Sequence, residues 1–247
     1  MIRIIIPAYN EAANLPGIIE DIAVALAAGS YHITVVNDGS KDATGSLLNG
    51  LAARYPLTTL THPVNRGVAA AFRTGFQAVL TDAADNDVVV FMEGDGTSPP
   101  ALIPLLASRI ERGADLVIAS RYQPGGGYTQ FPVKRLILSY GANLVFRLLF
   151  PIRGVRDYSI FYRAYRVPPL RAAMAEHQDA FITVETFFAN LEVLLKLRPY
   201  LRRVDEIPLR YDYGKKKGKS GMKVWKNLRS YLTFIARHGF RYGHHKH

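Results

Sequence analysis

A chain of 247 residues, 49% of them hydrophobic, is long enough to bury one large core, and its composition already excludes several kinds of site. The absence of cysteine excludes disulfides, thiolate metal sites and a cysteine nucleophile. Residues 210–247 hold 11 of the 31 Lys and Arg residues but one of the 20 acids, so nearly all of the net charge of +11 lies there. Such a basic block favours an anionic partner: nucleic acid, a membrane surface or a phosphate ligand.

The division of charge and the hydropathy together predict how the chain is organised. We expect a body at residues 1–209 and a basic appendage at residues 210–247. No segment approaches the ~18 consecutive apolar residues of a membrane span. The apolar run at residues 2–6 is too short for a signal peptide and lacks a cleavage site. The sequence therefore predicts a cytoplasmic protein.

Short apolar runs alternate with helical periodicity along the body. We expect strands at residues 3–7, 32–36, 57–60, 88–92 and 115–119. The first intervening helix should be capped by Asn14 and should bury Leu15, Ile18, Ile19, Ile22 and Leu26. Further helices should begin at Asp42, span residues 68–80, and run from Pro99-Pro100 to Gly113. This alternation predicts an α/β fold, a mostly parallel sheet with helices on both faces.

The strand at residues 88–92 ends abruptly in Glu93-Gly94-Asp95-Gly96. Side chains alternate along a strand, so Glu93 and Asp95 should point the same way, and the glycines would let a ligand approach the backbone. Two carboxylates at the carboxyl end of a strand can hold a divalent cation, and through it a diphosphate. The alternative interpretation is that an acidic turn merely ends the strand.

Polar residues also follow the preceding strands, as Tyr9-Asn10-Glu11, Asp38-Gly39-Ser40 and Asn65-Arg66-Gly67. In a doubly wound sheet these loops converge on one crevice with the acidic motif. An aromatic ring, a carboxylate, an arginine and a metal site together predict a pocket for a nucleotide diphosphate. The chain has neither a P-loop nor the dinucleotide fingerprint, so metal and side chains would have to hold the phosphates.

These motifs resemble those of a known family. The segments Pro7-Ala8-Tyr9-Asn10-Glu11 and Val36-Asn37-Asp38-Gly39-Ser40-Lys41-Asp42, with the acidic strand end, resemble the inverting family-two glycosyltransferases of the GT-A fold. Further segments resemble the polyprenyl-phosphate glycosyltransferases, which include the dolichol-phosphate mannose synthases. They are Pro99-Pro100, Ala119-Ser120-Arg121-Tyr122, Gly125-Gly126, Pro132…Arg135…Ser139, Arg163-Ala164-Tyr165-Arg166, Glu206-Ile207-Pro208 and Gly218-Lys219-Ser220.

The resemblance implies transfer of one sugar from a nucleotide diphosphate to a polyprenyl phosphate, with Mg²⁺ or Mn²⁺ as cofactor. It implies a metal site at Glu93 and Asp95 and catalytic roles for Asp95, Arg121 and Arg135. The nucleotide-sugar site would comprise Pro7, Tyr9, Glu11, Asp38, Arg66, Glu93, Gly94, Asp95, Thr97, Arg121, Lys217 and Lys219. The acceptor phosphate would meet Arg121, Arg135, Ser139 and Ser220. Asp157 and Glu185 are assigned no part in catalysis.

Three positions depart from the family's pattern. Glu93 stands where the first acid is usually Asp, and Ile160-Phe161 replaces Ser-Gly near the expected acceptor side. Lys217 replaces an arginine, which keeps the charge but loses bidentate phosphate binding. The second departure leaves the identity of the acceptor open.

The chemistry of the acceptor nevertheless favours a phosphate. A hydroxyl acceptor needs a general base, and many relatives that use such an acceptor carry an Asp for this with a Gln-x-x-Arg-Trp segment beside it. This chain lacks Gln-x-x-Arg-Trp, and its only tryptophan is Trp225. A phosphate monoester is already ionised at neutral pH, since its second pKa is about 6. Mannose from GDP-mannose is the expected donor sugar. UDP-glucose is the alternative, and whether a membrane-embedded partner subunit is required is left open.

A lipid acceptor requires a surface that docks on the membrane, and two segments have the composition of interfacial helices: residues 135–150 and 222–238. The first could equally pack its apolar face on the body; the second follows a lysine-rich segment, residues 214–221, expected to be mobile until ligands bind. We therefore expect peripheral membrane association.

The sequence also leaves other functions open: a glycosyltransferase with a soluble hydroxyl acceptor, a nucleotidyltransferase, and a basic nucleic-acid-binding protein, although no base-reading motif is present. The histidines at 244, 245 and 247 are expected to lie in a disordered tail.

Overall fold

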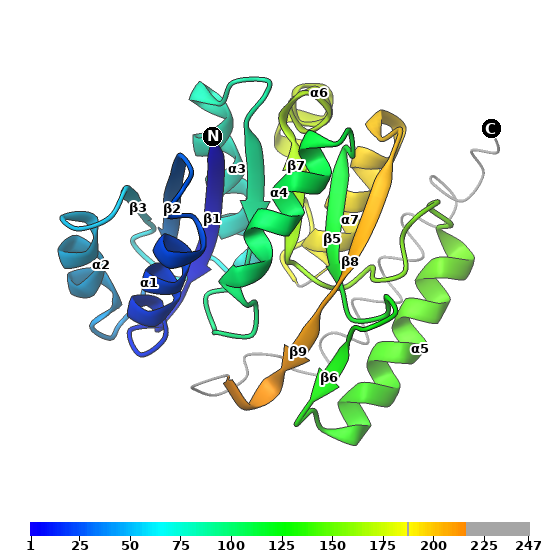
Figure 1. The fold of residues 1–247 in the computed structure, drawn as a ribbon, viewed down its shortest axis with the longest axis horizontal. Coiled ribbons are helices and arrows are strands. Elements are labelled where there is room, and N and C mark those ends of the chain that lie inside the picture. Colours follow the sequence, from blue (N-terminus) through cyan, green and yellow to red (C-terminus); the bar gives the residue numbers. More distant parts are fainter. Residues whose placement is uncertain (187, 216–247) are drawn as a thin grey trace.

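A seven-stranded sheet lies at the centre of the computed structural model, which describes residues 1–186 and 188–215 (Figure 1). Its strand order is β3-β2-β1-β4-β7-β5-β8. The strands are β1 Ile2–Ala8, β2 Tyr31–Asn37, β3 Leu57–Thr61, β4 Val88–Phe91, β5 Leu116–Ser120, β7 Arg163–Arg166 and β8 Val204–Pro208. Only β7 runs antiparallel to its neighbours β4 and β5. The mostly parallel sheet and the five expected strands are thus confirmed.

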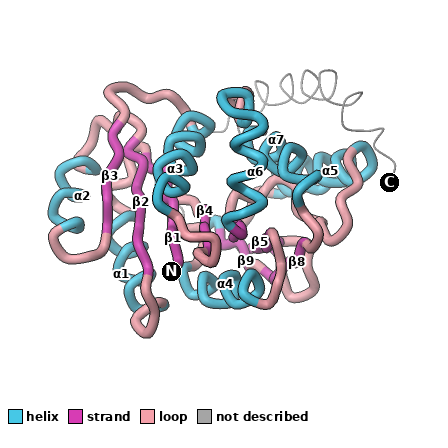
Figure 2. Tube along the Cα trace, turned by 90° about the horizontal axis from the view of Figure 1, so that it is seen from above, coloured by secondary structure: helices cyan, strands magenta, loops and turns pink. Residues whose placement is uncertain are grey.

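Helices cover both faces of this sheet, as expected. In Figure 2, α1 (Leu15–Ala25) and α4 (Ile103–Glu111) lie on one side, whereas α3 (Val68–Asp82), α6 (Val167–His177) and α7 (Ala189–Leu197) lie on the other. Helix α2 (Thr44–Ala52) packs beside β3 at the sheet's edge. A 3₁₀ turn at Pro100–Leu102 leads into α4.

Two expected helix caps were wrong in detail. Asn14 occupies the position before α1, but its side chain makes no capping bond; its amide instead donates to Glu11 Oε2 at 2.6 Å. The second helix begins at Thr44 rather than at Asp42, because the Asp42 carboxylate accepts the Thr44 backbone N–H and hydroxyl, at 3.0 and 2.5 Å, in the turn before the helix. The Asn14 amide and the Asp42 carboxylate thus hold the loops that precede the two helices.

The core explains why β4 is central. All four of its residues are buried, as is typical of parallel strands covered on both faces. Phe72 and Phe76 of α3 pack against Phe91 with ring centroids 4.1 and 6.1 Å apart. The register pairs Ile5 of β1 with Phe91. The carboxyl ends of β1, β2 and β4 therefore meet at one edge of the sheet.

A second, two-stranded sheet extends beyond the first. Here β6 (Gly127–Thr129) pairs in parallel with β9 (Arg210–Asp212), which continues directly from β8, and α5 (Val133–Leu149) lies alongside at the edge of the molecule (Figure 1). Residues 210–212, assigned to the basic appendage, are thus part of a sheet with the body. The expected loop beyond residue 215 and the expected helix at residues 222–238 lie outside the described residues. Within the described part of the chain, every helix is too short or too polar to cross a bilayer.

Candidate active site

The acidic motif follows β4 and is held tightly against the end of β1. A side chain at Gly94 would meet the carbonyl oxygen of Pro7, since a Cβ there would lie 2.8 Å from it. The Asp95 carboxylate accepts the backbone N–H and the hydroxyl of Thr97, at 3.2 and 2.5 Å, and Glu93 accepts the hydroxyl of Ser98. Thr97 and Ser98 thus hold the two carboxylates, and Gly94 lets the motif pack against the end of β1.

The electrostatics of this pair suit a cation. Burial raises the pKa of Glu93, and the neighbouring charge of Asp95 raises it further. A divalent cation would relieve this repulsion, and an oxygen-only donor set suits Mg²⁺ or Mn²⁺. Within residues 1–186 and 188–215, no group of three or more His, Asp or Glu side chains could hold a metal. The oxygens of a phosphate-bearing substrate and water are suitable further ligands for an ion on this pair.

Tyr211 of β9 lies close to the acidic motif, a position that the sequence reasoning missed. Burial raises the pKa of its hydroxyl, and so do the charges of Asp95 and Glu93, while the hydroxyl shares a hydrogen bond with Thr97. The chain then passes over Gly96, where a Cβ would lie 3.4 Å from the Lys215 carbonyl oxygen. The alternation of tyrosines at 211 and 213 was the one sequence signal for a strand at this point.

The other predicted donor residues lie on loops that are tied to one another. The Asn10 backbone N–H donates to Ser40 Oγ at 2.9 Å, and the Lys41 N–H donates to Asn10 Oδ1 at 2.8 Å. These bonds join the loops after β1 and β2. Tyr9 and Arg66 remain exposed at this edge, whereas Glu11 is half-buried and accepts the Asn14 amide. The structure therefore brings Pro7, Tyr9, Glu11 and Arg66 to the same edge of the sheet as the acidic motif.

Asp38 lies beneath these loops, and its side chain is 5% exposed. Its Oδ1 accepts the Arg66 N–H at 2.9 Å, and its Oδ2 accepts the Gly67 N–H at 2.8 Å. The ring of His62, at the end of β3, lies 2.6 Å from Oδ1. The predicted nucleoside contact of Asp38 is thus occupied, in this structure, by the loop that carries Arg66.

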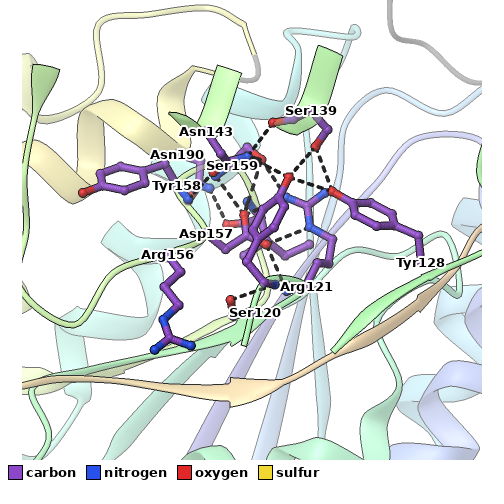
Figure 3. A network of polar contacts seen from close by, with 12 residues as sticks. Ser120, Arg121, Tyr128, Ser139, Asn143, Arg156, Asp157, Tyr158, Ser159 and Asn190 are labelled. Carbon is purple, nitrogen blue, oxygen red and sulfur yellow. Dashed lines mark hydrogen bonds and ion pairs between the residues drawn. The ribbon is translucent and has the colours of Figure 1, made fainter. Parts of the chain in front are cut away.

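Arg121 lies at the centre of a buried network (Figure 3). Its Nε and Nη2 donate to the two carboxylate oxygens of Asp157, both at 2.7 Å, and Nη2 also donates to Ser159 Oγ at 2.6 Å. Asp157 is fully buried and also accepts the backbone N–H groups of Arg121, Ser159 and Ile160. Although burial alone would raise the pKa of Asp157, the charge and hydrogen bonds of Arg121 hold it below its usual range. The Arg121 charge is therefore already compensated within the protein.

Three hydroxyl groups beside Arg121 form a closed ring of hydrogen bonds. The hydroxyl oxygens of Tyr122 and Tyr128 are 2.9 Å apart. The Ser139 hydroxyl of α5 lies 2.9 Å from that of Tyr122 and 2.8 Å from that of Tyr128; Tyr128 and Ser139 are labelled in Figure 3. Arg121 lies over the rings of Tyr122, Tyr128 and Tyr211, at 5.3 to 5.7 Å. Of the predicted acceptor residues, Arg121 and Ser139 are thus joined through these tyrosines.

Arg135, in the first turn of α5, is the second predicted arginine of this region. Its Nη1 donates to the Tyr213 hydroxyl at 2.7 Å, and its guanidinium lies over the same ring. Phe161, a departure from the family pattern, packs in the core against Phe72 and Phe91 and is 4% exposed. Lys217, Lys219 and Ser220 lie outside the described residues.

Comparison with known proteins connects this arrangement to a family. The family described as Glycosyl transferase family 2 matches residues 3–173. Dolichol-phosphate mannosyltransferase from Pyrococcus furiosus is 32% identical over 241 residues, 96% of this chain and 63% of its own length. Polyprenol monophosphomannose synthase from Mycolicibacterium smegmatis is 41% identical over 167 residues, 66% of this chain and 60% of its own length. The chain thus spans about three fifths of the length of these two relatives.

The fold itself also has relatives among solved structures. Glucosyl-3-phosphoglycerate synthase from Mycobacterium tuberculosis, solved with Mn²⁺, UDP and glucosyl-3-phosphoglycerate, matches with a TM-score of 0.64. The match covers 96% of this chain and 79% of that one, at 16% sequence identity. At that identity the likeness shows a shared fold.

Proposed function

The chain belongs to glycosyl transferase family 2, and from this we propose that it transfers a sugar from a nucleotide diphosphate to a polyprenyl phosphate. The predicted family and the GT-A fold are confirmed by the family match, the seven-stranded sheet and the structural likeness. The observation that carries the proposal is the pair of carboxylates, Glu93 and Asp95, at the carboxyl end of the central strand. Both curated relatives are named for mannose and polyprenol or dolichol, which supports mannose as the sugar.

On the donor side, Glu93 and Asp95 would hold Mg²⁺ or Mn²⁺. When bound, the ion supplies a Lewis acid that neutralises the departing diphosphate. Tyr9, Glu11 and Arg66 line the edge where the nucleoside and diphosphate would lie, with Pro7, Gly94 and Thr97 shaping its floor. Tyr211 lies close to the carboxylates and is bonded to Thr97, where its ring would shield the anomeric carbon from water.

On the acceptor side, the phosphate needs positioning and charge, because it is already ionised. Arg135 supplies the charge: its guanidinium stacks on Tyr213, in the turn that directly follows β9. The hydroxyls of Tyr122, Tyr128 and Ser139 supply hydrogen-bond donors. Arg121 acts through these tyrosines, since Asp157 already occupies two of its nitrogens. The inverting attack then proceeds in line from the phosphate oxygen to the anomeric carbon without a general base.

The activity is tested directly with purified protein, Mn²⁺ and a short polyprenyl phosphate in detergent. With GDP-mannose we expect mannosyl polyprenyl phosphate, identified by mass spectrometry, at a rate at least tenfold above that with UDP-glucose. This factor is the discrimination that one or two specific hydrogen bonds give. Product from UDP-glucose alone would establish the alternative donor. Sugar transfer that is unchanged without polyprenyl phosphate would contradict the proposed acceptor, and salt-sensitive RNA binding tighter than nucleotide-sugar binding would favour the nucleic-acid reading.

Helix α5 offers the surface through which the protein would reach a lipid. Among the side chains of α5 whose burial the structure describes, those of Asn143 and Phe146 are buried. Eight large apolar side chains are instead 38% to 73% exposed: Val133, Ile137, Leu138, Tyr140, Leu144, Val145, Leu148 and Leu149. Of the two interpretations of this helix, packing on the body and docking on a membrane, the first therefore accounts for only a narrow strip of its surface. An apolar surface of this extent on one helix indicates an interaction site.

The occupant that we propose for this face is a lipid bilayer. Arg135 and Ser139, assigned to the acceptor phosphate, lie on the same helix, so a lipid whose phosphate reached them would extend its chain along α5. Arg147 is exposed near the helix end and adds charge for anionic headgroups. The protein would thus associate peripherally with the membrane, with the active site facing the headgroups.

Replacing Leu144 and Leu148 together by aspartate should weaken binding to vesicles of phosphatidylcholine and phosphatidylglycerol at least tenfold. Each leucine contributes about 2 kcal/mol on burial, and each new charge adds repulsion. Co-sedimentation measures the effect. The matched control is Val24→Asp on α1, because Val24 is as exposed as Leu148, at 73%, but lies on a helix at the other side of the fold. Unchanged vesicle binding by the double variant would show that another segment of this chain, or a second copy, covers α5.

A further inference from the structure

His62 is a buried titratable residue to which neither the sequence motifs nor the proposed chemistry assigns a role. Its side chain is 7% exposed, and both ring nitrogens have partners. Nδ1 lies 2.6 Å from Asp38 Oδ1, and Nε2 lies 2.9 Å from the Thr74 hydroxyl on α3. Because a carboxylate can only accept, Nδ1 must carry the proton that faces Asp38. His62 therefore bridges the end of β2 and the first turns of α3.

The Asp38 carboxylate that His62 contacts is what holds the loop between β3 and α3. Its two oxygens accept consecutive backbone N–H groups, from Arg66 and Gly67. Gly39 lets the same loop approach closely, since a Cβ there would lie 2.4 Å from the Val64 backbone, and its φ of +68° favours glycine. The His62 N–H also donates to the Asn37 carbonyl at 2.9 Å. The position of Arg66 thus depends on the orientation of one carboxylate.

We infer that His62 is a positioning residue for the nucleotide diphosphate: it fixes the Asp38 carboxylate, which in turn places the 62–67 loop and the Arg66 side chain at the donor site. The physical reason is that Asp38 is buried and must keep its partners. With His62 present, the carboxylate can bond the loop with both oxygens. Without His62, the side chain can rotate toward the crevice, the two N–H bonds are lost, and Arg66 is released. This inference rests on the proposed function, because it assigns Arg66 to the donor.

The test measures binding of GDP, and of UDP in parallel, by calorimetry with Mn²⁺ and without any lipid. His62→Ala should weaken binding of the preferred nucleotide about tenfold, which is the loss in affinity expected when one hydrogen bond is removed. Thr74→Val, which removes the outer bond only, should weaken it about twofold. His62→Asn should retain most of the affinity, since its amide can still donate to Asp38.

A double-mutant cycle separates positioning from general loss of structure. In the Arg66→Ala background, His62→Ala should weaken binding by less than twofold further, because the residue that it positions is already gone. The matched control is His32→Ala: His32 also bonds a threonine hydroxyl, that of Thr58 at 2.9 Å, but at the opposite end of β2. It should leave nucleotide affinity unchanged. Thermal melts confirm that each variant is folded.

Three outcomes would overturn the inference: wild-type affinity in His62→Ala, an undiminished effect of His62→Ala in the Arg66→Ala background, or an equal loss in His32→Ala. If His62→Ala fails to fold, Thr74→Val decides the matter through the same cycle: its twofold loss should disappear in the Arg66→Ala background. Because no acceptor is present, an absence of sugar transfer to polyprenyl phosphate would reject the proposed function and leave this result intact. Absence of binding by either nucleotide to the unaltered protein would reject both.

Discussion

Replacing Asp95 by asparagine is expected to reduce sugar transfer about a thousandfold while leaving the protein folded. The amide oxygen can still accept the Thr97 N–H and hydroxyl, so the loop after β4 keeps its contacts. The negative charge is lost, however, and with it the cation that would neutralise the leaving diphosphate. A metal ion contributes several kcal/mol to such a transition state, and each 1.36 kcal/mol is tenfold in rate.

The measurement is kcat/KM with saturating Mn²⁺, together with the affinity for nucleotide in the presence and absence of metal. In Asp95→Asn the two affinities should become equal. Asp85→Asn is the control, because Asp85 is an exposed acid that precedes the same strand at its opposite end. If Asp95→Asn turned over at more than a tenth of the normal rate, the two carboxylates would not be the metal site.

Among the substitutions proposed for this protein, removal of the Asp157 carboxylate is expected to lower the free energy of unfolding the most. Asp157→Ala leaves the buried Arg121 guanidinium uncompensated, and breaking a buried pair in this way costs about 3–5 kcal/mol. Urea denaturation measures the loss. The double variant Arg121→Met with Asp157→Ala should be more stable than Asp157→Ala alone, because the unpaired charge is then gone. A loss below about 1 kcal/mol in Asp157→Ala would contradict the assignment of this pair as the anchor of the acceptor side.

The pH dependence of this effect has a definite sign. The pKa of Asp157 is lower in the folded protein than in the unfolded chain, because the charge and hydrogen bonds of Arg121 outweigh the effect of burial. Its contribution is therefore complete above the unfolded value, about pH 4, and is lost as the pH falls through the lower folded value. The difference between wild type and Asp157→Ala should be constant down to about pH 4 and should shrink below it.

A matched surface pair provides the control for both measurements. Arg203 Nε and Nη2 contact Asp205 at 3.0 and 2.7 Å, the same bidentate geometry as in the buried pair, but Arg203 is 49% exposed. Solvent screens such a pair, so Asp205→Ala should change stability by less than about 1 kcal/mol. Equal losses in the two alanine variants would show that burial does not decide the effect.

Amino-acid sequence alone determined the parallel part of the sheet, the inner faces of the helices and the acidic motif. These features are local: a run such as residues 88–92 must be buried on both sides, and the residues that follow it must emerge at the strand's end. The same locality explains why the family could be named from short segments. Capping by Asn14 was predicted wrongly, because its side chain is oriented by the hydrogen bond that its amide donates to Glu11.

Only the tertiary structure decided which distant residues meet. It placed β7 antiparallel between β4 and β5, set Tyr211 over an acidic motif more than 100 residues away, and joined Arg121 to Asp157 and His62 to Asp38. None of these partners has a periodic or spaced signal, because each contact joins segments that are far apart in the sequence. Short sequence motifs thus determine which chemical groups the site contains. The orientation of its charges depends on burial and on partners that only folding brings within hydrogen-bonding distance.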